Sequence, residues 1–151
     1  MKENSLHDKR IGLMLWRSSN IWQSKLRSGL KKFSISLNEF IILESIYLLR
    51  KDIIISQTDL SQFSGVDNSV VSIILKSLNK KKLIIKKIDL DNRKKNIKLT
   101  SEAISLLNKA IPVIKDIENN FFDKLGSEHI NFINSLKIIL RKKIRIKAES
   151  N

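Results

Sequence analysis

The sequence predicts a mainly α-helical protein with one small β-hairpin, and signals between residues 56 and 100 indicate this fold class. Ser56 and Asp59 can cap a short helix, Gly65 can take the positive φ of a tight turn, and Asp67 can cap a second helix. Two β-rich runs around a charged turn follow. Helix, turn, helix and hairpin in this order are typical of a winged helix-turn-helix lobe, whose second helix enters a DNA groove.

The charge of the chain favours the same interpretation. Its 151 residues include 29 Lys and Arg against 15 Asp and Glu, a formal net charge of +14. Such an excess favours a polyanionic partner, nucleic acid first and an anionic membrane surface second, with the codon bias of an AT-rich genome as the alternative explanation. Residues 76–98 hold ten basic and two acidic residues, whereas residues 101–130 hold three and five. A general compositional bias does not predict this contrast.

Other function classes lack the residues that they need. The chain has no cysteine, which excludes disulfides, thiol redox chemistry and Cys-zinc sites. No apolar run approaches the roughly 18 residues that span a bilayer, and residues 1–10 lack a signal-peptide core, so we expect a cytoplasmic protein with no membrane partner. His7 and His129 are far apart, and no catalytic or metal-ligand motif is present. We therefore expect no enzyme, no metal and no cofactor.

The elements before the helix-turn-helix follow from apolar periodicity and caps. Residues from Leu6 to about Lys32 place apolar side chains at helical spacing, which predicts one long amphipathic helix. Ser36 and Glu39 form a capping box for a second, largely buried helix that ends near Lys51. The β-branched run Ile53–Ile55 suits a brief strand that pairs with the hairpin.

The second helix of the helix-turn-helix has two distinct faces. Its buried face is predicted to consist of Val70, Val71, Ile74, Leu75 and Leu78. The other face is small, polar or cationic and suits close approach to a duplex, and with Val70 it supplies the candidate DNA-binding residues: Asn68, Ser69, Val70, Ser72, Ile73 and Lys76. The first turn also offers free N–H groups to phosphate.

The hairpin is predicted from Leu83–Ile88 and Asn96–Leu99, with its tip near Asp91–Arg93. A cationic tip beside a recognition helix can reach the adjacent minor groove, where negative potential attracts arginine. This adds Arg93, Lys94 and Lys95 to the candidate DNA-binding residues. An exposed, merely solvated hairpin is the alternative for any single one of them.

The C-terminal part is predicted to be helical. Thr100 starts a helix from Ser101 to about Leu125 that Pro112 should kink, and Gly126–Ser127 breaks it before a last helix. One face of that helix carries Ile130, Ile133, Leu136, Leu140 and Ile144. Because the two terminal segments lack an obvious partner of equal length within the chain, they are interpreted as dimerisation arms. We thus expect a single domain over 1–151, with a DNA-binding lobe at 37–100 and a helical dimerisation region at 6–35 and 101–147.

From about Leu13 to Leu140 the chain resembles the MarR-type winged-helix transcriptional regulators. The most specific matches are Gln57-Thr-Asp-Leu with Gly65-Val-Asp-Asn-Ser69, Leu78 through Lys81-Lys-Leu-Ile84, and Asp89-Leu-Asp-Asn-Arg93 ending in Leu99-Thr100. Leu15-Trp16 and Asn20-Ile-Trp-Gln23 also look like one branch of this family. The resemblance implies a homodimer that reads a pseudo-palindromic operator in double-stranded DNA.

The resemblance also implies a ligand response. Many family members release DNA when a small aromatic or lipophilic ligand binds between the dimer helices and the lobe, and such a pocket would lie near Trp16, Trp22 and Tyr47. Large apolar anchors of a core or a subunit interface are the alternative interpretation of the two tryptophans.

The chain departs from the family at three positions. Val70 and Ile73 stand where the family commonly has Thr and Arg, and an aliphatic side chain can contact a thymine methyl group but cannot pair with guanine. Lys82 replaces the helix-ending glycine. The predicted function is a dimeric, sequence-specific transcriptional regulator, most simply a repressor. The alternatives are a sequence-neutral architectural or RNA-binding protein that uses the same basic surface, and a lobe that has become an interaction module.

Overall fold

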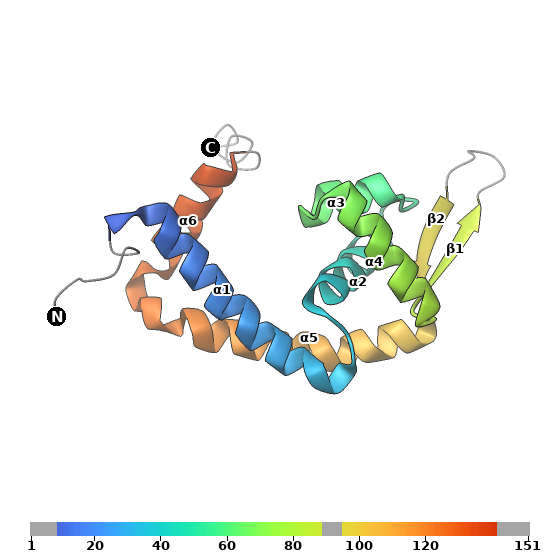
Figure 1. Cartoon of the computed structure of the whole chain (residues 1–151), viewed down its shortest axis with the longest axis horizontal. Coiled ribbons are helices and arrows are strands. Elements are labelled where there is room, and N and C mark those ends of the chain that lie inside the picture. Colours follow the sequence, from blue (N-terminus) through green and yellow to red (C-terminus); the bar gives the residue numbers. More distant parts are fainter. Residues whose placement is uncertain (1–8, 89–94, 142–151) are drawn as a thin grey trace.

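The computed structural model describes residues 9–88 and 95–141, which form a lobe and a helical arm (Figure 1). The lobe contains α2 (Leu37–Leu49), α3 (Gln57–Ser64), α4 (Asn68–Lys80) and the antiparallel strands β1 (Ile84–Ile88) and β2 (Lys95–Leu99). The arm contains α1 (Ile11–Leu30), α5 (Ser101–Phe122) and α6 (His129–Leu140). The short 3-10 helices η2 (Lys31–Phe33) and η3 (Asp123–Glu128) complete the described elements. The mainly α-helical fold with a two-stranded wing is confirmed.

The core lies in and directly beneath the lobe. Its buried side chains come from α2, α3, α4, the wing, the second half of α1 and the first two-thirds of α5, and include Leu43, Leu60, Leu75 and Leu107. Every buried hydrophobic residue that the structure describes lies between Leu26 and Ile114. The lobe therefore has its own packed interior, which includes one side of each helix that leaves it.

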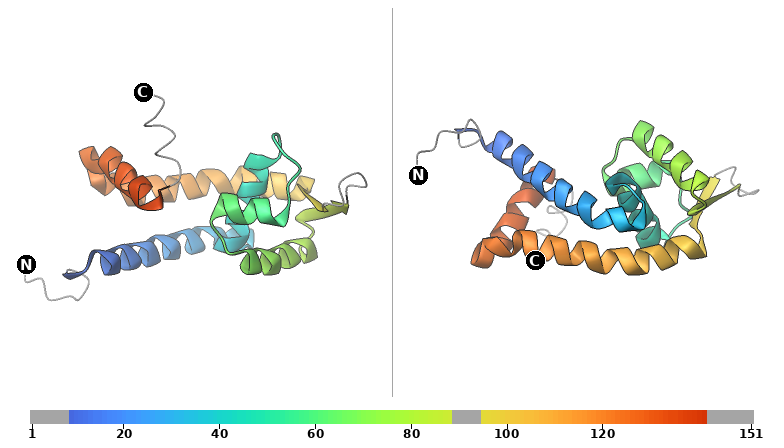
Figure 2. Two further views of the ribbon diagram at one scale, coloured as in Figure 1. Left: turned by 90° about the horizontal axis from the view of Figure 1, so that it is seen from above. Right: turned by 60° about the horizontal axis from the view of Figure 1, so that its bottom comes forward.

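The arm begins where α1 crosses α5 (Figure 2). Gly29 makes the crossing close, because a Cβ at this position would overlap the side chain of Ile117. The second half of α1 therefore has a packing partner within its own chain, which corrects the expectation that the N-terminal segment lacks one. The first half of α1 and the whole of α6 contribute no buried residue.

Several predicted boundaries shift. Arg10 has an extended backbone, so α1 begins at Ile11 rather than Leu6, and it ends at Leu30 before η2. The α5 helix continues through Pro112 and ends at Phe122, not Leu125. The non-helical backbone of Gly126 provides the predicted break, after which α6 starts at His129. Residues 6–8 and Ile144 lie outside the described residues.

Two local predictions are wrong in part. Residues 53–55 do not form a strand: the carbonyl of Ile55 accepts from the Ile97 N–H (3.0 Å), but the Ile55 N–H donates to the Asn96 side chain instead of the backbone (3.4 Å). At the start of α2, Ser36 Oγ accepts from the Glu39 N–H (3.1 Å), as predicted. The Glu39 carboxylate is instead bound to Lys81, so half of the capping box is replaced by an ion pair.

Candidate nucleic-acid interface

The turn between α3 and α4 has the local structure that its residues dictate. Ser56 and Asp59 form a complete capping box, and Gly65 ends α3 with φ +76°. Gln57 Nε2 then donates to the main-chain and side-chain oxygens of Asn68 (both 3.2 Å), and Ser61 Oγ donates to the Val66 carbonyl (2.7 Å). The start of α4 is thereby fixed on α3 by side-chain contacts as well as by packing.

The α4 helix presents the expected two faces. Val71, Ile74, Leu75 and Leu78 are buried, while Asn68, Ser69, Ile73 and Lys76 are exposed and Ser72 is half-buried. Val70 is half-buried and packs against the core, so it contributes less surface than the other candidates. Ile73 is 68% exposed, so its aliphatic side chain is available to a partner on the outer face of α4.

The first turn of α4 carries the only side-chain cap of this helix. Asp67 Oδ1 accepts from the Ser69 N–H at 3.4 Å, a long hydrogen bond on an exposed side chain. The remaining N–H groups of the turn point out of the helix end beside the exposed Asn68 and Ser69 side chains. This end of α4 can thus offer hydrogen-bond donors to a phosphate.

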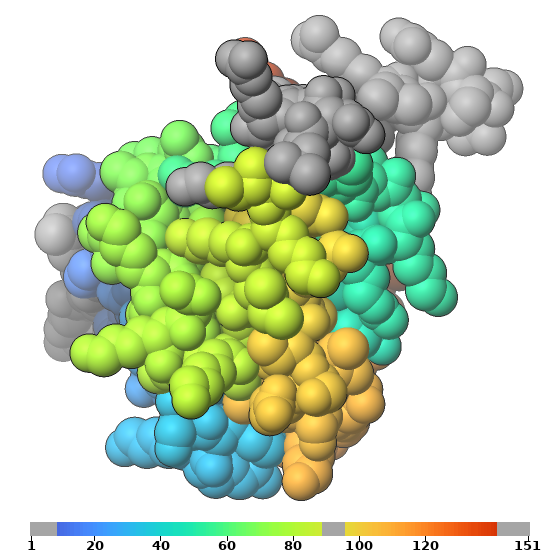
Figure 3. Space-filling model, turned by 90° about the vertical axis from the view of Figure 1, so that its right-hand side faces the viewer, coloured from blue at the N-terminus to red at the C-terminus, as the bar shows by residue number. Residues whose placement is uncertain are grey.

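The wing adds positive charge beside α4. Lys86, Lys87 and Lys98 are exposed, and the register pairs Ile85 with Lys98 and Lys87 with Asn96. Paired residues share one face of a sheet, so Lys87 and Lys98 lie on the same side. Figure 3 shows the wing strands, the end of α4 and the start of α5 on one surface. Arg93 and Lys94 lie outside the described residues, and Lys95 begins β2.

One lysine of the basic stretch 76–98 makes its contacts within the chain. Lys81 Nζ contacts both carboxylate oxygens of Glu39, at 2.8 and 3.1 Å, and the Ser34 carbonyl at 2.9 Å. The ammonium is therefore bound within the lobe rather than presented to a partner. Sequence reasoning missed this pair because 42 residues separate its members.

The three predicted ligand-binding residues lie on two helices. Trp16 is 60% exposed on α1, whereas Trp22 is partly buried against the core, and its Nε1 has no hydrogen-bond acceptor among the described residues. Tyr47 of α2 is half-buried, with the Arg50 guanidinium 3.5 Å from the centre of its ring. Nearby on α2, burial raises the pKa of the half-buried Glu44, repulsion from Glu118 of α5 raises it further, and Lys115 partly opposes both.

Two of the cavities lined by described residues lie away from these three side chains. One of about 460 Å³ lies between α1 and α5 and is lined by Lys25, Ser28, Gly29, Ile117, Asn120, Phe121 and Lys124. A groove of about 540 Å³ lies beside β2. Its lining includes isoleucines and the three cations Arg50, Lys51 and Lys98. Neither is lined by Trp16, Trp22 or Tyr47.

Two function classes find no matching feature in the part of the chain that the structure describes. No described helix is both long and apolar enough to cross a membrane. Residues 9–88 and 95–141 contain no group of three or more His, Asp or Glu side chains that could hold a metal ion.

Comparison with solved structures identifies the fold. The chain superimposes on MepR of Staphylococcus aureus in complex with DNA with a TM-score of 0.78 (23% identity, 88% of this chain and 96% of that one). It superimposes on a MarR mutant of E. coli in complex with operator DNA with a TM-score of 0.77 (15% identity, 92% and 100%). The chain has the MarR fold. No family model matches the sequence.

Two further comparisons bear on the MarR fold of this chain. BpsR of Bordetella bronchiseptica, whose DNA binding is regulated by 6-hydroxynicotinic acid, matches with a TM-score of 0.80 (18% identity, 92% of this chain and 98% of that one). Among curated proteins, the uncharacterized HTH-type transcriptional regulator YdcH of Bacillus subtilis is 27% identical over 132 residues, which are 86% of this chain and 89% of YdcH. The similarity in each case spans both the lobe and the arm.

Proposed function

We propose that the chain is a DNA-binding transcriptional regulator that acts as a homodimer. The observation that carries this proposal is the exposed face of α4, polar and cationic apart from Ile73, fixed on α3 and flanked by the lysines of the wing. The same fold is found in DNA complexes of MepR and MarR. The proposed activity is binding and requires no catalytic group.

The proposed contacts with DNA differ in the part of the duplex that each residue would bind. Asn68 and Ser69, with the free N–H groups of the first turn, would bind the backbone and the base edges at the mouth of the major groove. Ile73 would lie against thymine methyl groups, which favours A·T-rich half-sites. Lys76 and the wing cations, including Arg93, Lys94 and Lys95, would neutralise phosphates on either side.

The dimer is proposed from the arm. Ile11, Ile130, Ile138, Ile139 and Leu140 are all more than 60% exposed, and they lie on the two helices at the far end of the arm (Figure 1). Exposed apolar side chains in this number on two helices call for a partner, and a second copy supplies an identical pair of helices. Two lobes related by a two-fold axis would read two half-sites of a pseudo-palindromic operator.

Regulation by a small aromatic ligand is part of the proposal. BpsR, whose DNA binding responds to 6-hydroxynicotinic acid, shares the fold. In this chain Trp22 holds a buried N–H donor without an acceptor among the described residues, which is costly unless another group satisfies it. A carboxylate or carbonyl of an aromatic ligand near Trp16, Trp22 and Tyr47 would do so.

Titration against duplex DNA in increasing salt tests the binding proposal. We expect the affinity to fall by orders of magnitude between about 50 and 200 mM salt, because several phosphates per lobe are neutralised. Lys76→Met should weaken all sequences alike and reduce the slope of log affinity against log salt by about 2, because the homodimer loses one phosphate contact in each subunit. Lys109→Met, an exposed lysine of α5, is the matched control and should change neither quantity. An affinity that does not depend on salt would contradict the proposal.

A further inference from the structure

The turn that follows α4 contacts both places where the chain passes between lobe and arm. The first crossing is the segment 34–36, which joins α1 and η2 to α2, and the second is Thr100, which joins β2 to α5. Residues 81–83 lie between them, at the base of the wing.

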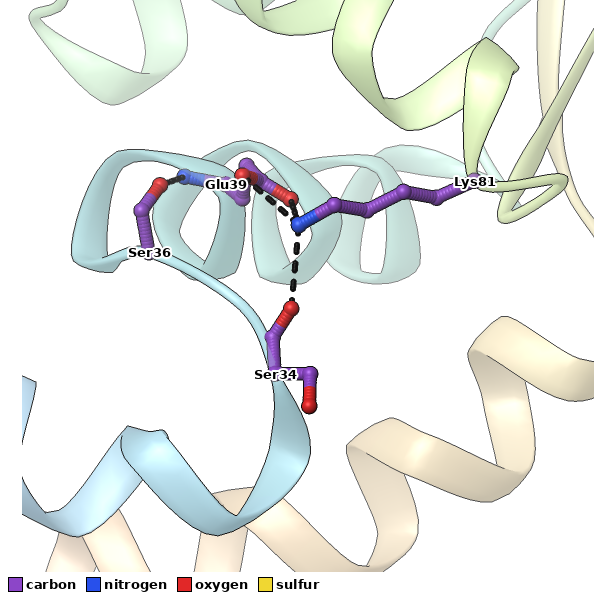
Figure 4. Close-up of polar contacts among 4 residues, drawn as sticks. All are labelled: Ser34, Ser36, Glu39 and Lys81. Carbon is purple, nitrogen blue, oxygen red and sulfur yellow. Dashed lines mark hydrogen bonds and ion pairs between the residues drawn. The ribbon is translucent and has the colours of Figure 1, made fainter.

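At the first crossing, the Lys81 ammonium makes three contacts (Figure 4). It donates to Glu39 Oε2 (2.8 Å), Glu39 Oε1 (3.1 Å) and the carbonyl of Ser34 (2.9 Å). An ammonium has three N–H donors, so this set can use all of them. Ser34 itself has a left-handed backbone, with φ +55°, where η2 ends. Lys81 thus joins the first residue of this crossing to the first turn of α2 and to the end of α4.

At the second crossing, Thr100 is tied to the same turn. Thr100 Oγ1 donates to the Lys82 carbonyl (2.9 Å), and the Thr100 N–H donates to the Leu83 carbonyl (3.1 Å). The same hydroxyl accepts from the Ala103 N–H (3.2 Å) and so caps α5. The direction in which α5 leaves the lobe is therefore linked to the turn by two hydrogen bonds, and the third bond fixes the first turn of α5 to Thr100.

The turn itself has a defined shape. The Lys82 N–H donates to the Asn79 carbonyl, the Leu83 N–H donates to the Leu78 carbonyl, and Lys82 has φ +58°. These are the two hydrogen bonds and the left-handed residue of a Schellman motif, in which an apolar residue after the turn packs on the last helical turn. Leu83 and Leu78 are both buried. A rigid turn can transmit the position of one crossing to the other.

We propose that Lys81 is a positioning residue that fixes the orientation of the lobe relative to α1 and α5. In the proposed homodimer this orientation sets the separation of the two α4 helices, and hence the half-site spacing that the protein accepts. The inference about orientation concerns one chain alone, whereas its consequence for DNA rests on the proposed function. The Glu39 side chain is 11% exposed and the Lys81 side chain 39%, so the carboxylate is sheltered while the ammonium stays partly in solvent.

Distances within one chain test the orientation directly. The chain has no cysteine, so Gln62→Cys on α3 and Asn119→Cys on α5 give two unique spin labels on exposed positions of lobe and arm. Labelled protein diluted into unlabelled protein reports only the distance within a chain. The variant is Lys81→Met, which keeps the length of the side chain and removes the charge. Lys80→Met, the adjacent exposed lysine, is matched in charge and size.

We expect one narrow distance peak for the parent protein and for Lys80→Met. Lys81→Met should raise the population outside that peak about tenfold, as the loss of charge-assisted hydrogen bonds to a sheltered carboxylate implies. Lys81→Arg should restore most of the narrow peak, since a guanidinium can pair with both carboxylate oxygens. Glu39→Gln removes the charge without adding bulk and should broaden the peak less, which keeps the test available if Lys81→Met does not fold.

An unchanged peak in folded Lys81→Met or Glu39→Gln would overturn the inference, even if the melting temperature falls, because the ion pair would then stabilise the lobe without orienting it. A second experiment measures binding to DNA with paired half-sites whose spacing increases by single base pairs. We expect Lys81→Met to flatten the preference of the parent protein for one spacing. If the parent protein binds no DNA, the proposed function fails while the distance measurement still decides the inference.

Discussion

Several isoleucine side chains are buried in the lobe, whereas those at the far end of the arm are exposed. In the lobe, Ile42, Ile46 and Ile74 are buried, and the exposed side of α4 consists largely of small polar and cationic residues. In the arm, α6 has no buried residue, and Ile130, Ile138 and Ile139 are each at least 64% exposed. The lobe buries a core of large apolar side chains within one chain, whereas the far end of the arm leaves such side chains exposed.

The contacts of the lobe are made within one chain, whereas those of α6 would form only in the proposed dimer. A buried isoleucine in the lobe stabilises one chain whatever its concentration, whereas an exposed isoleucine in α6 gains its stabilisation only on association. Substitutions in the two regions should therefore differ in concentration dependence as well as in size.

Ile139→Asp in α6 should abolish the dimer at micromolar concentration. A carboxylate on an apolar interface would be desolvated in both subunits of a symmetric dimer, so we expect the dimer dissociation constant to rise at least 100-fold. Analytical ultracentrifugation measures the change. Ile85→Asp, at an exposed isoleucine of the wing, is the control and should leave the dimer intact. A dimer that survives Ile139→Asp would show that the Ile139 side of α6 is not part of the interface.

Leu60→Ala in α3 should destabilise the lobe by about 2–5 kcal/mol, since this side chain is fully buried and a cavity would remain. Chemical denaturation followed by circular dichroism gives the free energy of unfolding. The loss should be the same at low and high protein concentration, in contrast to the effect of Ile139→Asp. A loss that disappears at high concentration would mean that the lobe also depends on the partner.

Lys82→Gly should stabilise the protein by up to about 1 kcal/mol, because Lys82 has φ +58° and glycine takes this conformation without a Cβ clash. Greater freedom of glycine in the unfolded chain offsets part of the gain. Lys80 lies two residues earlier and is the last residue of α4. Lys80→Gly should instead destabilise the protein by about 0.5–1 kcal/mol, because glycine is a poor helix former. Thermal melts of both variants measure these opposite signs, and equal signs would contradict the assignment of the left-handed turn.

Glu44→Gln should have a small, pH-dependent effect. Burial and Glu118 raise the pKa of Glu44 in the folded chain above its ordinary value of 4.5. The Glu44 carboxyl therefore binds a proton more tightly in the folded chain than in the unfolded chain. Its contribution to stability is fully present below about pH 4.5 and is lost as the pH rises through the raised pKa. Glu44→Gln should be slightly more stable than the parent protein at neutral pH and equal to it at pH 4.

An NMR titration of Glu44 checks the cause of this shift. In Glu118→Gln the repulsion is removed, so the pKa of Glu44 should move back toward its ordinary value while burial keeps it raised. An unchanged pKa would assign the whole shift to burial.

Much of the lobe could be predicted because its signals are local. The Ser56–Asp59 capping box, the positive φ of Gly65 and the Asp67 cap each depend on residues within a few positions, and all three are confirmed. The strand expected at Ile53–Ile55 is wrong because its pairing depends on Asn96, whose side chain competes with the backbone for the Ile55 N–H. Similarly, Glu39 satisfied the capping pattern but pairs with Lys81, 42 residues away.

The exposed and buried faces of the candidate site could be predicted from the sequence, but the availability of its individual lysines could not. Helical periodicity separated Ile73 and Lys76 from the buried Ile74 and Leu75, and the structure has the same division. Basic composition alone could not separate Lys76, which is exposed, from Lys81, whose ammonium is bound within the lobe. Which lysines remain available to a partner is a property of tertiary packing.

The central claim is that the chain reads a symmetric DNA sequence as a dimer, and selection from a random pool of duplexes tests it most directly. Bound molecules should converge on two A·T-rich half-sites related by a two-fold axis, with centres separated by about one helical turn, 10–10.5 base pairs, or a multiple of it. Tight binding without an enriched motif would contradict the claim and would identify the chain as a sequence-neutral nucleic-acid-binding protein.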